Sequence, residues 1–293
     1  MKPVPFDLLR PRTLDEAVAL LAEDPDDSKV LAGGQSLVPL LNFRLARPAR
    51  LIDLSLLTEL ITHAHHDGYA RLGAMVRQAR AEHSPDLAHD VPLLTEALPN
   101  IAHPPIRARG TVGGNLAHAD PASELPAVAT ALDAVFVAVG PRGAREIPAA
   151  AFFRSHFLSD LADDEILTEV RFPICPGSTG AAFLEVGRRR GDYALVGVGV
   201  QVTRDGPRIV DVRVAVTGVA QTPFRAVDVE ELLRGRPLDD EGLAAAAESL
   251  RATINPGTDL HATADHRRYV AGTLLTRALH AADRRADDAR LAA

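Results

Sequence analysis

Apolar and polar positions along the chain switch between a helical period and a strand period. Residues 13–23 place apolar side chains at helical spacing, and Thr13 followed by Glu16 three positions later is typical of a capping box at a helix start. Short apolar runs further on predict strands at residues 29–34 and 50–55. Between them, residues 37–45 predict a helix that accommodates Pro39 in its first turn.

Two pairs of apolar runs are separated by turn residues and predict β-hairpins. The first covers residues 60–75 and turns at His66-Asp67-Gly68. The second covers residues 133–148 and turns at a Pro-Arg-Gly sequence. A further strand is predicted over residues 164–173, and a helix that starts with Asp120 as N-cap and Pro121 at the first helical position is predicted to run to about residue 131.

The pattern changes after residues 175–180, where the sequence CPGSTG interrupts it. Valines recur at every second position in residues 196–202 and again in residues 210–216, and Asp205-Gly206 supplies a turn between these runs. This alternation predicts an antiparallel pair of strands with one buried face. Three helices are predicted after it, at about residues 226–235, 240–252 and 264–288.

The predicted fold class is α+β with two domains. We place a first domain at residues 1–176, made of subdomains at about 1–56 and 57–176. A smaller α+β domain with an antiparallel sheet and helices follows at residues 177–286. Residues 287–293 form a tail that is expected to fray.

Composition excludes several classes of function. The 293 residues carry a net charge of −7 with scattered basic residues, so no nucleic-acid partner is expected. Lys2 and Lys29 are the only lysines and neither lies in a phosphate-binding Gly-Lys-Ser/Thr sequence. Cys175 is the only cysteine, which excludes an intrachain disulfide and any cysteine-ligated iron–sulfur cluster held by this chain alone. Without a signal peptide or a membrane span, the expected location is cytoplasmic.

Paired glycines occur twice, at residues 33–34 and 113–114, each beside polar residues and a predicted helix. A glycine pair lets the backbone approach a ligand and turn its N–H groups toward an anion. Two such loops suit an extended diphosphate, but two tight turns without a ligand explain them equally well. Asp120 and Glu124 are candidates for sugar hydroxyls, with a plain N-cap as the alternative for Asp120. Because neither loop fits G-x-G-x-x-G, the residues alone indicate a dinucleotide site that is not of the Rossmann type.

The two loop sequences, AGGQSLVPLLNFRL and IRARGTVGGNLAHADPASELPAV, carry a family resemblance. They resemble the FAD-binding medium subunit of the molybdenum hydroxylases, the group of aerobic carbon-monoxide dehydrogenase and bacterial xanthine-dehydrogenase-like enzymes. PFDLLRPRTLDEAVALL, DEILTEVRFP and FLEVGRRRGDYALVGVGV extend the resemblance over essentially the whole chain. It implies a vanillyl-alcohol-oxidase-like (PCMH-type) FAD-binding domain of two subdomains, followed by the C-terminal domain of the molybdenum hydroxylase flavoprotein subunit.

The resemblance also implies a set of FAD-binding residues. The first loop would wrap the diphosphate, the second would hold its other side, and Asp120 and Glu124 would lie at the ribose or adenine end. Leu167 would pack near the adenine, while Tyr193 would lie near the isoalloxazine ring, with a core aromatic as the alternative for Tyr193. His118 is an even choice between cofactor contact and loop support. The full set is Leu31, Ala32, Gly33, Gly34, Gln35, Ser36, Leu37, Ile101, Ala102, Gly110, Thr111, Gly114, Asn115, His118, Asp120, Glu124, Leu167 and Tyr193.

Two departures from a simple flavin site remain. Relatives often carry a lysine near the position of Glu185, and a glutamate there would disfavour an anionic reduced flavin. His63, His65 and His66 could be metal ligands, but a solvated hairpin turn is the favoured interpretation, so no metal site is expected.

The resemblance implies an electron-transfer subunit without acid–base catalytic residues. FAD on this chain would receive electrons from [2Fe-2S] clusters on a small subunit, after a molybdenum-cofactor large subunit has oxidised the substrate. The expected assembly is a heterotrimer doubled into a heterohexamer. The alternative is a stand-alone FAD-dependent oxidase or dehydrogenase with its own substrate pocket, and a third hypothesis is a subunit that has lost its flavin.

Overall fold

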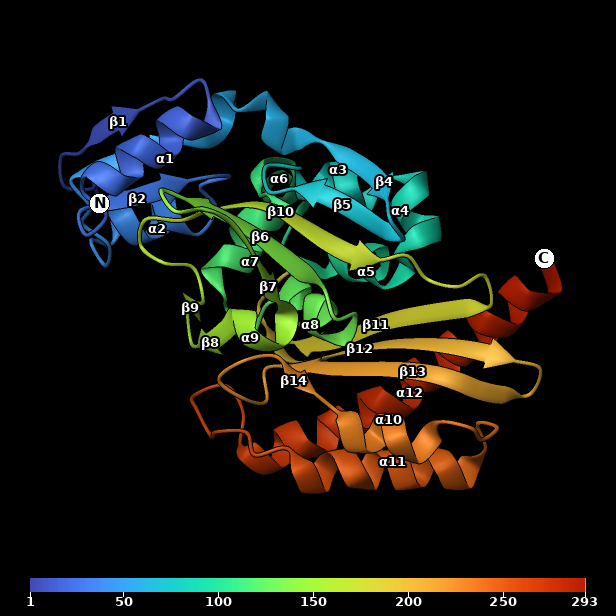
Figure 1. The fold of residues 1–293 in the computed structure, drawn as a ribbon. Coiled ribbons are helices and arrows are strands. Elements are labelled where there is room, and N and C mark those ends of the chain that lie inside the picture. The colour runs from blue at the N-terminus through green and yellow to red at the C-terminus, as the bar shows by residue number, and fades with distance from the viewer. Residues whose placement is uncertain (293) are drawn as a thin grey trace.

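The structure is a computed structural model that describes residues 1–292, and it contains a small parallel sheet, a larger antiparallel sheet and a C-terminal sheet (Figure 1). The parallel sheet has the strand order β1-β3-β2. Its elements are β1 (Asp7–Leu9), α1 (Leu14–Glu23), β2 (Ser28–Leu31), α2 (Leu37–Asn42) and β3 (Arg50–Asp53).

The predicted cap of α1 is confirmed, with one difference in its partner. The Thr13 hydroxyl accepts a hydrogen bond from the Glu16 N–H at 3.2 Å. The Glu16 carboxylate reaches back to the N–H of Arg12 at 2.7 Å, one residue before the N-cap that a standard capping box would use. The start of α1 is therefore fixed from both sides.

The second sheet has five strands in the order β4-β5-β10-β6-β7, and both predicted hairpins are confirmed in it. Phe136 of β6 stacks on Phe152 in its core, with ring centroids 3.8 Å apart. Its strands are β4 (His63–His66), β5 (Tyr69–Gly73), β6 (Val135–Gly140), β7 (Gly143–Pro148) and β10 (Ile166–Pro173), and a separate small pair is formed by β8 (Phe153–Ser155) and β9 (Leu158–Ser159). The associated helices are α3 (Gln78–Glu82), α4 (Pro85–Asp90), α5 (Pro92–Ala97), α6 (Pro104–Arg109), α7 (Val112–His118), α8 (Glu124–Ala131) and α9 (Ala149–Phe152).

The predicted start of α8 is wrong. The helix begins at Glu124, with Ser123 in the N-cap position, and not at Pro121. Asp120 instead closes a local turn, because its Oδ1 accepts a hydrogen bond from the Ala122 N–H at 2.9 Å. An aspartate followed by proline suits such a turn as well as a helix cap, and the sequence does not distinguish the two.

The C-terminal sheet has the order β11-β12-β13-β14 and is covered by helices that follow it in the chain (Figure 1). Its elements are β11 (Thr179–Gly187), β12 (Ala194–Asp205), β13 (Arg208–Thr217), β14 (Phe224–Arg225), α10 (Val227–Leu233), α11 (Asp240–Thr253) and α12 (Ala264–Ala292). Helix α12 extends past the predicted end, so residues 287–292 are helical, where a fraying tail was expected. Residue 293 lies outside the described part.

The valine alternation is confirmed in β12 and corrected in β13. Val196, Val198, Val200 and Val202 are buried against the C-terminal helices. In β13 the pairing shifts so that Thr203 faces Asp211 and Arg204 faces Ile209, which leaves Val210 as the extra residue of a β-bulge. Val210 is therefore exposed and Ile209 is buried in its place.

The prediction of a single buried face in this sheet is also wrong. Its other face packs on helices α5 and α8, and residues of β11 and β13 such as Phe183 and Ala215 join the core of the larger antiparallel sheet. Gly197 and Gly199 leave room for the Phe183 ring, since an added Cβ at either would lie 3.2 Å from it. Glycines such as Gly197 and Gly199 on this face form no apolar pattern in the sequence, so the second buried face was not predicted. No helix within residues 1–292 is long and apolar enough to cross a membrane.

Candidate functional site: two glycine loops and a carboxyl cluster

The first glycine loop connects β2 to α2 and requires its glycines. Gly34 has φ +73°, a backbone conformation that residues with a side chain rarely adopt. A Cβ on Gly33 would lie 2.4 Å from the carbonyl oxygen of Arg109 and 2.8 Å from the Cα of Gly110. The first loop therefore touches the backbone of the second loop directly.

Hydrogen-bond donors of the first loop point to an anionic ligand. The Gln35 side chain donates to the Gly33 carbonyl at 2.9 Å and braces the turn. Within residues 1–292, the backbone N–H groups of residues 33–36 donate to no protein acceptor, and the Ser36 side chain makes no capping bond to α2. Unpaired donors gathered beside glycines form a cradle that fits a phosphate group.

The second glycine pair was expected in a loop before a helix, but it lies in the first turn of α7, because Thr111 caps the helix just before it. The second loop, which leads from α6 into this turn, uses its backbone donors differently. The N–H groups of Val112 and Gly113 donate to the carbonyls of Val76 and Ala74, each at 2.9 Å. The N–H of Gly114 donates to the Thr111 hydroxyl at 3.0 Å, which caps α7. Because these donors are used internally, the second loop can offer a ligand mainly its side chains.

The two loops also meet at a second point, between Ala32 and Gly114. A Cβ on Gly114 would lie 3.1 Å from the Cβ of Ala32. Gly113 is fixed from behind, because a Cβ there would lie 2.4 Å from that of Ala74. The two predicted glycine segments thus lie in direct contact, an arrangement that a shared ligand would require.

The Ile101-Ala102 segment is held in place by a buried ion pair that the sequence analysis did not identify. Arg107 Nε lies 2.7 Å from Glu82 Oε2, and its Nη2 lies 3.0 Å from Oε1. The Nη1 of Arg107 donates to the Ile101 carbonyl at 2.9 Å. Ala102 has φ +44°, so this arginine supports a segment with an unfavourable backbone conformation.

A loop from the C-terminal domain reaches the same segment. Gly191 has φ +87°, and a Cβ there would lie 2.4 Å from Cε1 of His103 and 2.9 Å from the Ala102 carbonyl oxygen. Tyr193 follows in this loop, with 68% of its surface exposed. An exposed tyrosine here excludes the core-aromatic alternative.

Carboxyl groups with raised pKa values gather near Tyr193. Burial raises the pKa of Glu124 to about 7, partly offset by its backbone hydrogen bond. Burial, and then the neighbouring Glu124, raise the pKa of Glu185 to about 8, and its Oε2 is buried without a hydrogen-bond partner in the described structure. Desolvation, followed by Asp120 and Glu124, raises the pKa of the Tyr193 phenol.

This cluster changes two expectations. The family resemblance implies that Asp120 and Glu124 lie at one end of the cofactor and Tyr193 at the other, whereas both carboxyl groups lie near enough to Tyr193 to raise the pKa of its phenol. Glu185 has its pKa at about 8, so it is mostly protonated at pH 7 and brings little negative charge to the site. The expected electrostatic penalty of a glutamate at this position therefore applies only at higher pH.

The remaining predicted residues lie around these loops. Asn115 Oδ1 accepts a hydrogen bond from Ser123 at 2.9 Å, which ties α7 to the start of α8. His118 is half-buried beside Phe157, with ring centroids 5.0 Å apart, and burial lowers the pKa of its imidazole. Leu167 is buried in the core of the larger antiparallel sheet. The residues of the first loop, from Leu31 to Leu37, are all half-buried.

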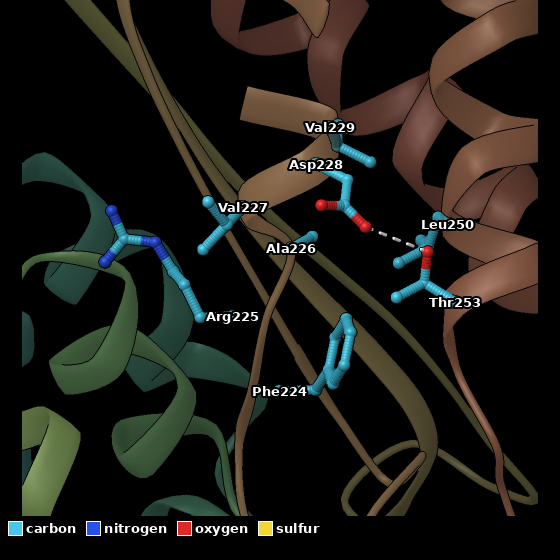
Figure 2. A pocket seen from close by; sticks show the side chains of 8 residues that line it. All are labelled: Phe224, Arg225, Ala226, Val227, Asp228, Val229, Leu250 and Thr253. Carbon is cyan, nitrogen blue, oxygen red and sulfur yellow. Dashed lines mark hydrogen bonds between the residues drawn. The ribbon is translucent and has the colours of Figure 1, made fainter. Parts of the chain in front are cut away.

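A separate cavity of about 230 Å³ lies in the C-terminal domain (Figure 2). Figure 2 shows Asp228 pointing toward Thr253, to which it is hydrogen-bonded at 3.3 Å, while Arg225 points away from them. Arg225 is engaged by Glu230 and Asp133. None of the predicted cofactor residues lines this cavity.

Comparisons with known proteins identify the family. Residues 4–175 match the family model described as the FAD binding domain in molybdopterin dehydrogenase, and residues 181–282 match the CO dehydrogenase flavoprotein C-terminal domain. The chain therefore belongs to the family of FAD-binding subunits of molybdopterin dehydrogenases. It contains an FAD-binding domain and is an oxidoreductase subunit, and the expected α+β, vanillyl-alcohol-oxidase-like fold is confirmed.

Individual relatives resemble the chain over nearly its full length. The 6-hydroxypseudooxynicotine dehydrogenase complex subunit alpha of Paenarthrobacter nicotinovorans is 41% identical over 98% of this chain and 97% of its own. Caffeine dehydrogenase subunit beta of Pseudomonas sp. (strain CBB1) is 41% identical over 97% of each chain. A solved structure of carbon monoxide dehydrogenase from Hydrogenophaga pseudoflava is 38% identical with a TM-score of 0.94, covering 97% of this chain and 99% of that one.

Proposed function

We propose that this chain is the FAD-binding electron-transfer subunit of a molybdenum-containing hydroxylase or dehydrogenase complex. The observation that carries the proposal is the contact between the two glycine loops, where four backbone N–H groups at residues 33–36 have no acceptor among the described residues of the chain. Such donors match the diphosphate of FAD. The division at residues 1–176 and 177–286 belongs to the proposal and is supported by the separate sheets of the two parts.

In this proposal each group of residues has a distinct task. The N–H groups of residues 33–36 and the Ser36 hydroxyl hold the diphosphate, and the side chains of Thr111 and Asn115 complete the site from the second loop. Ile101 and Ala102, held by Arg107, form a wall beside the cofactor. Asp120, Glu124 and Tyr193 contact a common part of the cofactor, because they lie together. Gly110, His118 and Leu167 support the surrounding backbone and core.

Bound FAD supplies a centre that accepts electrons and passes them on in pairs. We propose that the electrons come from [2Fe-2S] clusters on a small partner subunit and originate at a molybdenum cofactor on a large one. The single cysteine of this chain supports that division, because cysteine-ligated clusters must be held elsewhere. Two relatives are a dehydrogenase complex subunit alpha and a dehydrogenase subunit beta, which supports a complex of several subunits. In this proposal the assembly is a heterotrimer, doubled into a heterohexamer, in the cytoplasm.

The first test is a visible absorbance spectrum of the purified chain before and after added FAD, followed by desalting. Flavin bands that survive desalting and differ from those of free FAD are the expected result. If neither the isolated chain nor the complex purified from its native cells retains flavin, the proposal is wrong. Reduction of the flavin by a substrate with this chain alone would favour a stand-alone oxidase or dehydrogenase instead.

A further inference from the structure

Two histidines at the edge of the five-stranded sheet face an aspartate from a neighbouring helix. His63 and His65 lie two positions apart on the edge strand β4, so their side chains point to the same face. Asp86, in the first turn of α4, joins them. One ligand atom from each of these three residues lies within 4.8 Å of the others.

The spacing of the imidazole nitrogens matches that of two ligands on one metal ion. The Nε2 atoms of His63 and His65 are 3.2 Å apart, with the rings tilted by 54°. Two nitrogens bound to tetrahedral zinc at the usual 2.0–2.1 Å are separated by about 3.3 Å. The rings need little movement to share an ion.

A buried carboxylate lies beside one of these rings. Asp90 Oδ2 lies 3.0 Å from Nδ1 of His65, and the Asp90 side chain is only 9% exposed. No described residue donates a hydrogen bond to Asp90 Oδ2, so this buried oxygen is available to accept the Nδ1 proton when His65 turns to bind an ion through Nε2, the atom that faces His63. Carboxylates in this position commonly support zinc-bound histidines.

We propose that His63, His65 and Asp86 form a binding site for a zinc ion, with the fourth position open to water. Two neutral imidazoles and one carboxylate are donors that zinc prefers. Arg80, a cation that acts electrostatically on His63, is engaged by the Ile61 carbonyl, to which its Nη1 donates at 3.2 Å. Zinc at this position links the β4–β5 hairpin to α4 and uses no residue of the FAD loops, so the proposal is independent of the flavin.

Sequence spacing pointed to a solvated turn here because it showed only the histidines and Asp67. The fold changes this interpretation by bringing Asp86 and Asp90 to the strand from a helix about twenty residues later. The side chain of His66 points to the opposite face of β4 from His63 and His65. It pairs instead with Asp67, with Nδ1 to Oδ2 at 2.6 Å. It therefore provides an internal control within the same strand.

The test is a titration of the untagged, chelator-treated full chain with Zn²⁺ by calorimetry. Co²⁺ is added in a parallel titration, followed as a difference spectrum against the metal-free protein. One zinc ion per chain and the absorption bands of tetrahedral cobalt are expected. His65→Gln and Asp86→Asn, both at exposed positions, each weaken binding at least about 100-fold, and Asp90→Asn weakens it about 10- to 100-fold.

The control variant His66→Gln keeps wild-type affinity. The proposal is overturned if zinc does not bind stoichiometrically, or if His66→Gln weakens binding as much as His65→Gln does. Circular dichroism of each variant establishes that it is folded. If Asp90→Asn does not fold, the variants at the exposed positions His65 and Asp86 still test the proposal.

Discussion

The carbonyl oxygen of Arg109 occupies the space beside Gly33 where any other residue would carry its Cβ. The separation from that Cβ position is only 2.4 Å, and the neighbouring Gly110 Cα is 2.8 Å away. Backbone atoms cannot rotate aside as a flexible side chain can. The glycine of the first loop is thus needed for contact with the second loop as well as for access by a ligand.

Gly33→Ala is expected to separate the loops and weaken FAD binding on the order of ten-fold or more, which corresponds to at least about 1.4 kcal/mol. Stability of the protein without flavin should fall by about 1–3 kcal/mol, as for other overpacked sites. Fluorescence titration with FAD and urea denaturation measure the two effects. Gly177→Ala is the matched control, since nothing lies within 4 Å of its added Cβ. Equal FAD affinity in both variants would refute the importance of this contact.

Two threonines that cap different helices allow the effect of the second loop on FAD binding to be distinguished from the effect of helix stability. Thr111 caps α7 at the site, and Thr13 caps α1 in the parallel-sheet part of the chain. Thr111→Val and Thr13→Val should each cost about 1 kcal/mol of unfolding free energy, measured in urea. Only Thr111→Val is expected to lower FAD affinity as well. A similar loss of affinity in Thr13→Val would mean that flavin binding reports overall stability and not the second loop.

The buried Arg107–Glu82 pair should be costly to break from one side. Arg107→Met leaves a buried carboxylate unpaired and is expected to destabilise the chain by about 3–5 kcal/mol, measured by urea denaturation. Arg107→Met combined with Glu82→Met removes both charges and should restore part of that loss. If the double variant is as unstable as the sum of the two single variants, the residues do not act as a pair.

Glu124 makes stability depend on pH in a definite direction. Its pKa is raised from 4.5 to about 7 in the folded chain, so the unfolded state releases its proton first. The contribution of Glu124 to the stability of the flavin-free chain should therefore fall as pH rises from about 4.5 to 7, by about 3 kcal/mol, and then level off. Glu124→Gln removes this contribution, which is measured as the difference between variant and wild type across urea denaturations at each pH. The exposed Glu231→Gln serves as control and should preserve the wild-type profile.

Local elements were largely predictable from the sequence. Turn residues and alternation located both hairpins, and the Thr13 cap needed only nearby residues. The errors arose where distant parts meet. The Val210 bulge depends on pairing with β12, and the second buried face of the C-terminal sheet depends on α5 and α8. For the same reason Glu82, 25 residues before Arg107, gave no signal of its role.

In the candidate site, too, local features were predictable from the sequence and contacts between distant residues were not. The two glycine pairs predicted both loops, and the family resemblance indicated that the loops share FAD as a ligand. Neither showed that the backbone N–H groups of the first loop lack acceptors among residues 1–292 while those of the second are used internally, because the second loop's bonds depend on contacts with Val76 and Ala74. The raised pKa values of Glu124 and Glu185 likewise depend on burial between the two domains.

The C-terminal sheet, covered on both faces, constrains how this chain can be divided or recombined. Cutting near residue 176 would strip α5 and α8 from β11–β13 and expose Phe183 and Ala215, which pack in the core of the preceding domain. Each half would then expose an apolar surface to water, although every sheet keeps all of its strands. A chimera that joins one half of this chain to the other half of a relative would need complementary side chains across this surface. The chain is therefore best exchanged between complexes as one unit.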